Sequence, residues 1–124
     1  MSKIELGNEQ IKVMRILWEK RRATAQEITE ALSRHEPVKL VNIQMLLRRL
    51  VQKKIIDYDV VERIYIYYPL VEKDKVTNQA LHNFIDHIFA GSTDEMISYV
   101  LKNERISPEV LEKIRIMLKE KEDR

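Results

Sequence analysis

The stretch of residues 40–54 has two contrasting faces when it is wound as an α-helix. Apolar side chains recur at helical spacing and form one stripe, which consists of Ile43, Leu46, Leu47, Leu50 and Val51. This stripe predicts a helix that packs one side into a hydrophobic core. The other face is polar and cationic, and it carries Val41, Asn42, Gln44, Met45, Arg48, Arg49 and Gln52, with Lys53 and Lys54 at its end.

The groups on that second face suit a DNA groove. Cations pair with phosphates, the amide of Asn42 can pair with the edge of adenine, and the side chain of Met45 can cover a thymine methyl. An amphipathic helix with a solvated outer face has the same pattern in many proteins, so the helix alone does not decide its role. The segment that follows it favours DNA binding.

Two short segments with period-two alternation come directly after the helix. Residues 56–60 and 64–68 are rich in β-branched and aromatic side chains, and a connection over residues 61–63 separates them. They predict a β-hairpin. Helices followed by such a hairpin have the element order of a winged helix-turn-helix domain, in which one helix enters the major groove.

Within the predicted hairpin, Arg63 is the best candidate for a phosphate contact. Asp57 and Asp59 alternate outward on the first strand and should face away from DNA. Tyr65 and Tyr67 are expected to pack the sheet.

Two further helices are predicted upstream. Residues 8–20 place Ile11, Met14, Leu17 and Trp18 on one side, as expected of a scaffold helix. Thr24 and Glu27 form a capping box at the start of the second helix. That helix should end near Pro37, because proline disfavours helical geometry in the residue before it.

The second half of the chain is also helical in pattern. A helix over residues 72–90 should stop at Gly91, and Ser92 and Ser107 are each placed to cap another helix. Three apolar stripes in residues 72–124 are more than this segment can bury against itself, so the pattern predicts a homodimer. A monomer whose tail folds back is the alternative. The predicted dimerisation residues are Phe84, Ile85, Ile88, Phe89, Met96, Ile97, Val100, Leu101, Val110, Leu111, Ile114, Met117 and Leu118.

The predicted fold is therefore mainly α with a small β-hairpin wing, divided into two domains. Residues 1–71 form the winged-helix DNA-binding domain, and residues 72–124 form a three-helix dimerisation domain. Residues 1–71 hold 13 Lys and Arg against 9 Asp and Glu, whereas residues 72–124 hold 9 against 11, so the halves carry charges of +4 and −2. A basic half joined to an acidic half fits a DNA-binding module joined to another kind of module.

Composition argues against several other classes of protein. The 124 residues include no cysteine, which excludes disulfides and thiolate metal sites and fits a cytoplasmic protein. No stretch approaches the ~20 apolar residues that cross a bilayer, so no membrane insertion is expected. His82 and His87 are five residues apart and fall on different helix faces, and only two glycines are present to build a tight catalytic site. We expect no enzymatic activity, no bound metal and no cofactor.

Three segments resemble the penicillinase and methicillin-resistance repressor family of winged-helix regulators, which also includes copper-responsive relatives. They are residues 8–18 in the first helix, residues 43–50 in the third and residues 63–69 in the wing. The resemblance covers essentially the whole chain.

The resemblance implies a dimeric repressor that binds a palindromic operator ahead of antibiotic-resistance genes, such as those of a β-lactam operon. It further implies a membrane sensor protease as a partner, which relieves repression by cutting the repressor in its C-terminal helices. The family's cleavage point falls on Tyr99 and Val100, where an asparagine–phenylalanine pair is usual.

This chain departs from the family pattern at two kinds of position. Asn42 and Met45 stand where the family typically carries threonines, which implies different base contacts and an altered operator. Lys54 and Glu62 stand where glycines are common, at the entrance and turn of the hairpin. A winged-helix protein-interaction module without operator binding is the alternative function, and the weak net charge of +2 offers it some support.

Overall fold

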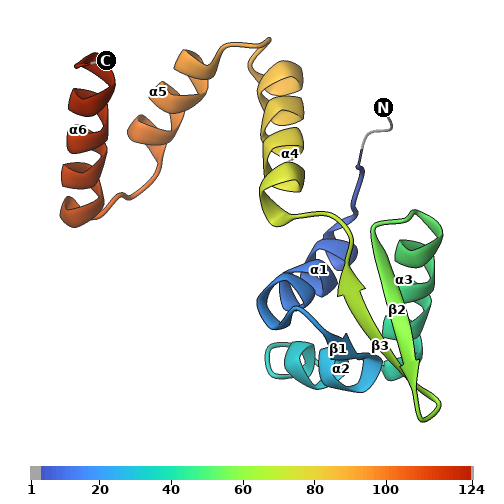
Figure 1. Cartoon of the computed structure of the whole chain (residues 1–124). Helices are drawn as coiled ribbons and strands as arrows, with labels where there is room; N and C mark the ends of the chain where they lie inside the picture. Colours follow the sequence, from blue (N-terminus) through green and yellow to red (C-terminus); the bar gives the residue numbers. More distant parts are fainter. Residues whose placement is uncertain (1–3, 124) are drawn as a thin grey trace. The chain divides into compact units, whose positions relative to one another are not determined.

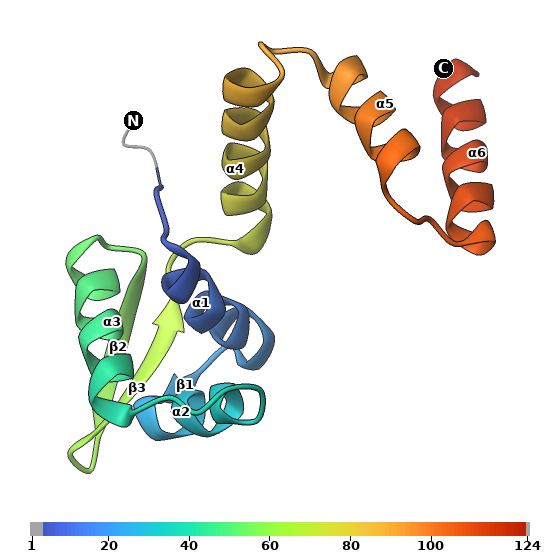
Figure 2. The same ribbon diagram turned by 180° about the vertical axis from the view of Figure 1, so that it is seen from behind.

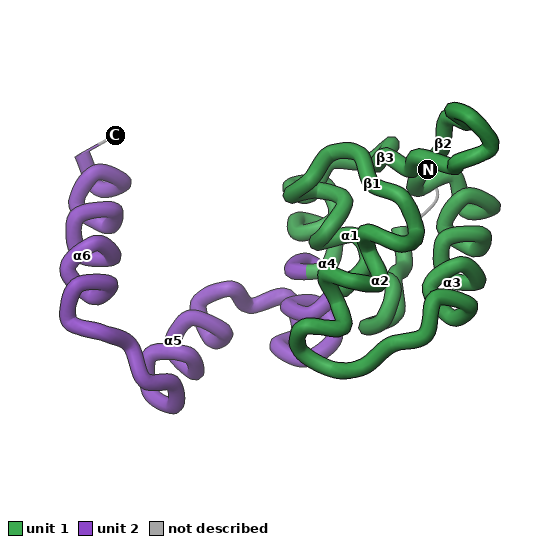
Figure 3. Tube along the Cα trace, turned by 90° about the horizontal axis from the view of Figure 1, so that it is seen from below, with its two compact units in different colours: residues 1–80 green, residues 81–124 purple. Residues whose placement is uncertain are grey.

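The computed structural model describes residues 4–123, and its helices and strands follow one another as shown in Figure 1. The chain divides into two compact units, residues 1–80 and residues 81–124 (Figure 3). The division falls inside one helix, α4, and the predicted domain boundary after residue 71 lies just before that helix begins. The elements are α1 (Asn8–Lys20), β1 (Ala23–Thr24), α2 (Ala25–Ser33), α3 (Leu40–Gln52), β2 (Ile56–Val61), β3 (Ile64–Pro69), α4 (Lys73–Ile88), α5 (Thr93–Asn103) and α6 (Pro108–Glu122).

The first unit is built around one hydrophobic core that α1, α2, α3 and the start of β2 share. The predicted stripe of α3 is confirmed, because Ile43, Leu47 and Leu50 are buried while Leu46 and Val51 pack at the edge of the core. The core residues from the other elements are Val13, Met14, Leu17, Ala23, Ile28, Ile55 and Ile56. Burial of this one face leaves the opposite face of α3 in solvent.

The wing is an antiparallel sheet with the strand order β1, β3, β2. The hairpin was predicted, but β1 was not, because two residues give no alternation to detect. In β1, Ala23 pairs with Tyr67 and Thr24 with Ile66. Figure 2 shows that β1 leads directly into α2, so the third strand attaches the helical layer to the wing.

The predicted connection over residues 61–63 is wrong by one residue. Val61 pairs with Ile64, which leaves Glu62 and Arg63 as a two-residue turn. Both have positive φ, +50° and +69°, as a type I′ turn requires. Asparagine and glycine adopt this turn most readily, so a Glu–Arg pair concealed the tight turn in the sequence.

The third helix also ends earlier than predicted, at Gln52 rather than at Lys54. Lys54 has φ +62°, and the chain reverses there through two hydrogen bonds, from Lys54 N to Val51 O and from Ile55 N to Leu50 O, both 3.0 Å. These are the two bonds of a Schellman C-cap, whose left-handed position normally belongs to glycine. Lys54 and Glu62, where the family commonly has glycine, therefore both adopt left-handed geometry.

Side-chain caps fix the starts of three helices, as the sequence predicts. The hydroxyl of Thr24 accepts from Glu27 N at 3.1 Å, and the Glu27 carboxylate accepts from Thr24 N at 2.9 Å. The Thr24 backbone amide, followed by its hydroxyl, holds the pKa of the Glu27 carboxyl below its usual range. Ser92 and Ser107 accept from Glu95 N and Val110 N in the same way.

In the second half of the chain, α4 covers Lys73–Ile88 rather than the predicted residues 72–90. The helix ends before Ala90 and Gly91, and both of these residues have positive φ, so the left-handed turn that ends the helix involves Ala90 as well as the predicted Gly91.

Phe89 makes edge-to-face contacts with Phe84 and Tyr99, at centroid distances of 5.7 and 6.0 Å. Neither α5 nor α6 has a buried residue within the described chain. Across residues 4–123, no helix is both long and apolar enough to cross a bilayer.

Lys54 generates a prediction about stability. Lys54→Gly should raise the free energy of unfolding by about 1 kcal/mol, because glycine removes the steric cost of a side chain in the left-handed region. Gln44→Gly, inside the same helix, should instead lower it by about 1 kcal/mol. Urea denaturation of the two variants measures both effects, and a loss of stability in both would contradict the strained cap.

Candidate nucleic-acid interface

The exposed face of α3 carries seven of the residues that the sequence predicted there, and their side chains divide into two rows. Val41, Asn42, Met45 and Arg49 border a shallow depression beside residues 37–39. Gln44, Arg48 and Gln52 border a second depression beside the wing. All seven side chains are exposed, so the outer ridge of the helix, along which Val41 and Met45 lie between the two depressions, is free to enter a groove.

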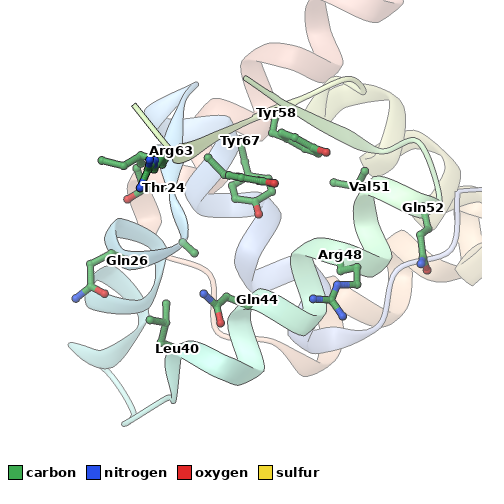
Figure 4. Close-up of a pocket in the computed structure, with 13 residues that line it drawn as sticks. Thr24, Gln26, Leu40, Gln44, Arg48, Val51, Gln52, Tyr58, Arg63 and Tyr67 are labelled. Atoms are coloured by element: carbon green, nitrogen blue, oxygen red, sulfur yellow. The ribbon is translucent and has the colours of Figure 1, made fainter. Parts of the chain in front are cut away.

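The second depression, here called the wing-side hollow, lies between α3, the hairpin and the first turn of α2. Figure 4 shows Gln44 and Arg48 on α3 and Tyr58 and Tyr67 on the hairpin. Its volume is about 790 Å³. The lining residues are Thr24, Ala25, Gln26, Leu40, Gln44, Arg48, Val51, Gln52, Tyr58, Arg63, Ile64, Tyr65 and Tyr67. Two of these are arginines and none is an aspartate or glutamate.

Three tyrosines from the two strands of the hairpin share one face of the wing. Tyr58 and Tyr65 stack with their ring centroids 4.7 Å apart and their planes 19° apart, and Tyr67 packs on both at a tilt. Desolvation of the phenol, followed by the neighbouring Tyr65 and Tyr58, raises the pKa of Tyr67, while the positive charge of Arg48 lowers it. The Tyr67 phenol therefore stays protonated well above neutral pH.

The two aspartates of the hairpin, Asp57 and Asp59, lie on its opposite face. In the observed register, Tyr58 faces Tyr67 and Asp59 faces Ile66, so adjacent residues of β2 point to opposite sides. Asp59 Oδ2 accepts from Arg22 Nη2 at 2.7 Å, and the guanidinium of Arg22 lies 5.4 Å from the ring centroid of Tyr68. This contact neutralises a carboxylate that would otherwise add negative charge to the wing.

The cations at the ends of α3 and the hairpin have different surroundings. Lys53 Nζ donates to Glu5 O and to Gln10 Oε1, each at 3.2 Å, so its ammonium is held against the segment before α1 and the start of that helix. Lys54 and Arg63 are exposed, and their side chains make no hydrogen bond or ion pair within the described part of the chain. Of the three cations, Lys53 therefore has the least freedom to move toward a ligand.

Sequence reasoning did not select Thr24, Gln26 and Tyr58 for this surface. Thr24 was recognised only as a helix cap, and its second role depends on β1, which brings the start of α2 beside β3. The period-two pattern did contain a signal for Tyr58, since it shares a strand face with Tyr65 and Tyr67 once the register is known.

The predicted dimerisation residues are mostly exposed within the single chain. Ile85 is the exception, with 4% of its surface exposed, because the chain itself already covers it. Phe89, Met96 and Ile114 are half-buried. The remaining members are exposed, namely Phe84, Ile88, Ile97, Val100, Leu101, Val110, Leu111, Met117 and Leu118.

The predicted cleavage position lies in the middle of a helix. Tyr99 and Val100 are both exposed, but the peptide bond that joins them is within α5. Asn103 Nδ2 donates to Tyr99 O at 2.9 Å, which adds a side-chain bond to that turn of the helix.

Among residues 4–123, no three His, Asp or Glu side chains come together as a metal site would require. His87 Nδ1 lies 2.7 Å from Asn83 O in the preceding turn of α4, so that ring is paired locally.

Comparison with known proteins identifies the family to which these features belong. The family model for penicillinase repressors matches residues 6–120. The chain belongs to the penicillinase repressor family. Its members are transcriptional repressors rather than enzymes, and the resemblance seen in the sequence is confirmed.

Curated relatives match over nearly their full lengths. The methicillin resistance regulatory protein MecI of Staphylococcus aureus is 28% identical over 117 residues, which are 94% of this chain and 95% of the relative. The penicillinase repressor of Bacillus licheniformis is 23% identical over 125 residues, and the match covers 100% of this chain and 98% of the relative.

Solved structures confirm the winged-helix fold. The DNA-binding domain of the repressor BlaI superposes with a TM-score of 0.53 at 24% identity and covers 59% of this chain and 90% of its own. A MarR mutant of E. coli complexed with operator DNA gives a TM-score of 0.55 at 18% identity and covers 94% of this chain and 75% of its own.

Proposed function

We propose that the chain is a dimeric repressor that binds a palindromic operator of an antibiotic-resistance operon, of the β-lactam type, through α3 and the wing. The observation that carries this proposal is the outer face of α3, which is exposed, cationic and free of carboxylates in a chain of the penicillinase repressor family. The names of the relatives, penicillinase repressor and methicillin resistance regulatory protein, support the choice of a resistance operon.

The two rows of α3 suggest how bases are read. Asn42 can accept from and donate to the Hoogsteen edge of adenine, and Met45, next to it on the ridge, presents a flexible apolar group to a thymine methyl. Arg48 and Arg49 lie on opposite sides of the ridge and offer guanidinium groups to guanine edges or to phosphates. Arg63 at the tip of the wing and Lys54 at the end of α3 are placed for backbone contacts.

Selection of bound duplexes from a random pool tests base reading by the ridge. Asn42→Ala should relax the selected sequence at one position in each half-site and weaken binding of the dimer to the wild-type sequence by about a hundredfold, since each half-site loses one bidentate base contact worth ~1–3 kcal/mol. Binding to unrelated duplex should hardly change. Asn78→Ala, which removes the same exposed amide from α4, is the matched control. A wild-type chain that selects no sequence and binds no duplex would favour the protein-interaction module instead.

The proposed dimer rests on the apolar surface of the second half of the chain. Two helices with amphipathic faces and no buried residue leave many large apolar side chains in water. A two-fold partner covers such a surface with a copy of itself, and two copies hold two recognition helices for the two half-sites of a palindrome. Ile85 is already buried, so it supports the interface from behind rather than contacting the partner.

Two neighbouring residues of α6 allow a matched test of the dimer. Met117 belongs to the predicted stripe and is 65% exposed, whereas Ile116 faces away from that stripe and is 52% exposed. Met117→Asp should shift the chain to monomer at micromolar concentration in sedimentation equilibrium, because an aspartate in an apolar interface has no partner. Ile116→Asp should leave the dimer intact. Equal effects of both substitutions, or a monomeric wild type at tens of micromolar, would contradict the proposed interface.

Relief of repression is proposed to come from a membrane sensor protease that cuts between Tyr99 and Val100. A cut there separates α6 and the end of α5 from the rest of the chain, so most of the proposed interface is lost. The repressor then loses the linkage between half-sites, which can be worth ~10²-fold or more in avidity. Since proteases bind extended segments, α5 must unwind locally before the bond can be reached.

Mapping the cut after incubation with the sensor protease tests this mechanism. Lys102→Gly lies in α5 beyond the bond and should accelerate cleavage about fivefold, because glycine lowers helix stability by ~1 kcal/mol. Lys113→Gly in α6 is the control and should leave the rate unchanged. Cleavage elsewhere in the chain, or at an equal rate in all three proteins, would contradict the proposed step.

A further inference from the structure

We infer that the wing-side hollow is a seat for the sugar–phosphate backbone of one DNA strand, in which the tyrosines of the wing are contact residues as well as packing. This inference rests on the proposed operator binding and extends the contact surface from the tip of the wing to its inner face. The ligand is a phosphodiester chain, and the added contact residues are Tyr58 and Tyr65, with Arg48 on the facing helix.

The charges around the hollow select an anion. Arg48 and Arg63 supply two permanent positive charges, and none of the lining residues is acidic. Of the acidic residues of the hairpin, Asp57 and Asp59 are on its other face, where Arg22 pairs with Asp59 at 2.7 Å, and Glu62 is in the turn beside Arg63 and does not line the hollow. The depression between α1 and α2 differs, because Glu9, Glu19 and Glu36 line it together with Lys12 and Arg15. Of the two, the wing-side hollow suits a polyanion.

The polar groups in the hollow are hydrogen-bond donors suited to phosphate oxygens. Tyr58 and Tyr65 are 37% and 47% exposed, so part of each side chain is open to a ligand. Their stacking at 4.7 Å holds both rings in place before a ligand arrives, which limits the entropy lost on binding. Gln26, Gln44 and Gln52 add amide donors from two helices.

The position of the hollow also fits a backbone rather than a base pair. It lies to one side of the ridge formed by Val41 and Met45, between the helix that would enter the major groove and the wing that would flank it. A strand that borders the major groove passes through this place when α3 is inserted. The first turn of α2 opens onto the same hollow through Thr24 and Gln26, and the positive end of its dipole adds a small favourable field.

Conservative variants separate backbone contact from packing. Tyr58→Phe and Tyr65→Phe keep the stacked rings and remove only the hydroxyls, while Tyr68→Phe does the same on the opposite face of β3 and is the control. The duplexes are the sequence that the wild type selects and an unrelated sequence, titrated over a range of KCl by fluorescence anisotropy. Tyr58→Phe and Tyr65→Phe should each weaken binding of the dimer to both duplexes by a similar factor of about a hundred, because each subunit loses one hydrogen bond to a charged group, worth about tenfold.

Arg48→Gln provides the electrostatic readout. It should reduce the magnitude of the slope of log K against log salt by ~1.8 for the dimer, because one phosphate neutralisation is lost in each half-site. A neutral methylphosphonate placed at each linkage in turn should weaken the wild type at one linkage per half-site, and at that linkage it should weaken Tyr65→Phe less, because only the contacts of the arginines are left to lose.

The outcomes distinguish this inference from the proposed function. If the wild type selects an operator but Tyr58→Phe and Tyr65→Phe bind it as tightly as Tyr68→Phe does, the inference about the tyrosines is overturned, while the proposed repressor function is retained. If the wild type binds no duplex, the proposed function fails first. A labelled polyglutamate peptide that binds in preference to both duplexes, and loses affinity in Tyr65→Phe, would overturn the choice of DNA as the occupant.

Discussion

The packing of α3 against the core determines the orientation of the candidate DNA-contacting side chains on this helix. Ile43, Leu47 and Leu50 are buried against α1 and the first strand of the hairpin, and this fixes the rotation of the helix about its axis. Because a helix turns 100° per residue, a rotation that buries these three side chains leaves Val41, Met45 and Gln52 outermost. A fixed rotation also determines which row faces the wing, so the composition of the hollow follows from the composition of the core.

Much of this arrangement could be predicted from sequence, because it depends on local periodicity. The stripe of α3, the scaffold helix and the Thr24–Glu27 cap each require only residues within one or two turns of one another, and each was predicted correctly. The family was also recognisable, because three separated segments agreed in order and spacing. The roles assigned to individual DNA-contacting and dimerisation residues stay predictions.

The errors occurred where the backbone geometry conflicts with residue preference. Lys54 and Glu62 adopt left-handed conformations that are normally expected of glycine. For this reason α3 was predicted too long and the turn between β2 and β3 too wide. The strand β1 was missed for a different reason: it exists only because β3 offers it a partner distant in sequence. The wing-side hollow depends on that same pairing, and no pattern within a single segment could reveal it.

The exposed helices of the second half have a consequence for the lifetime of the protein in a cell. In the proposed dimer, every dissociation event uncovers the apolar faces of α5 and α6, which form no core of their own. Quality-control proteases and chaperones recognise surfaces of this kind, so a separated subunit is open to them until it finds a new partner. In the proposed dimer, dissociation would thus connect the loss of repression to the loss of the chain itself.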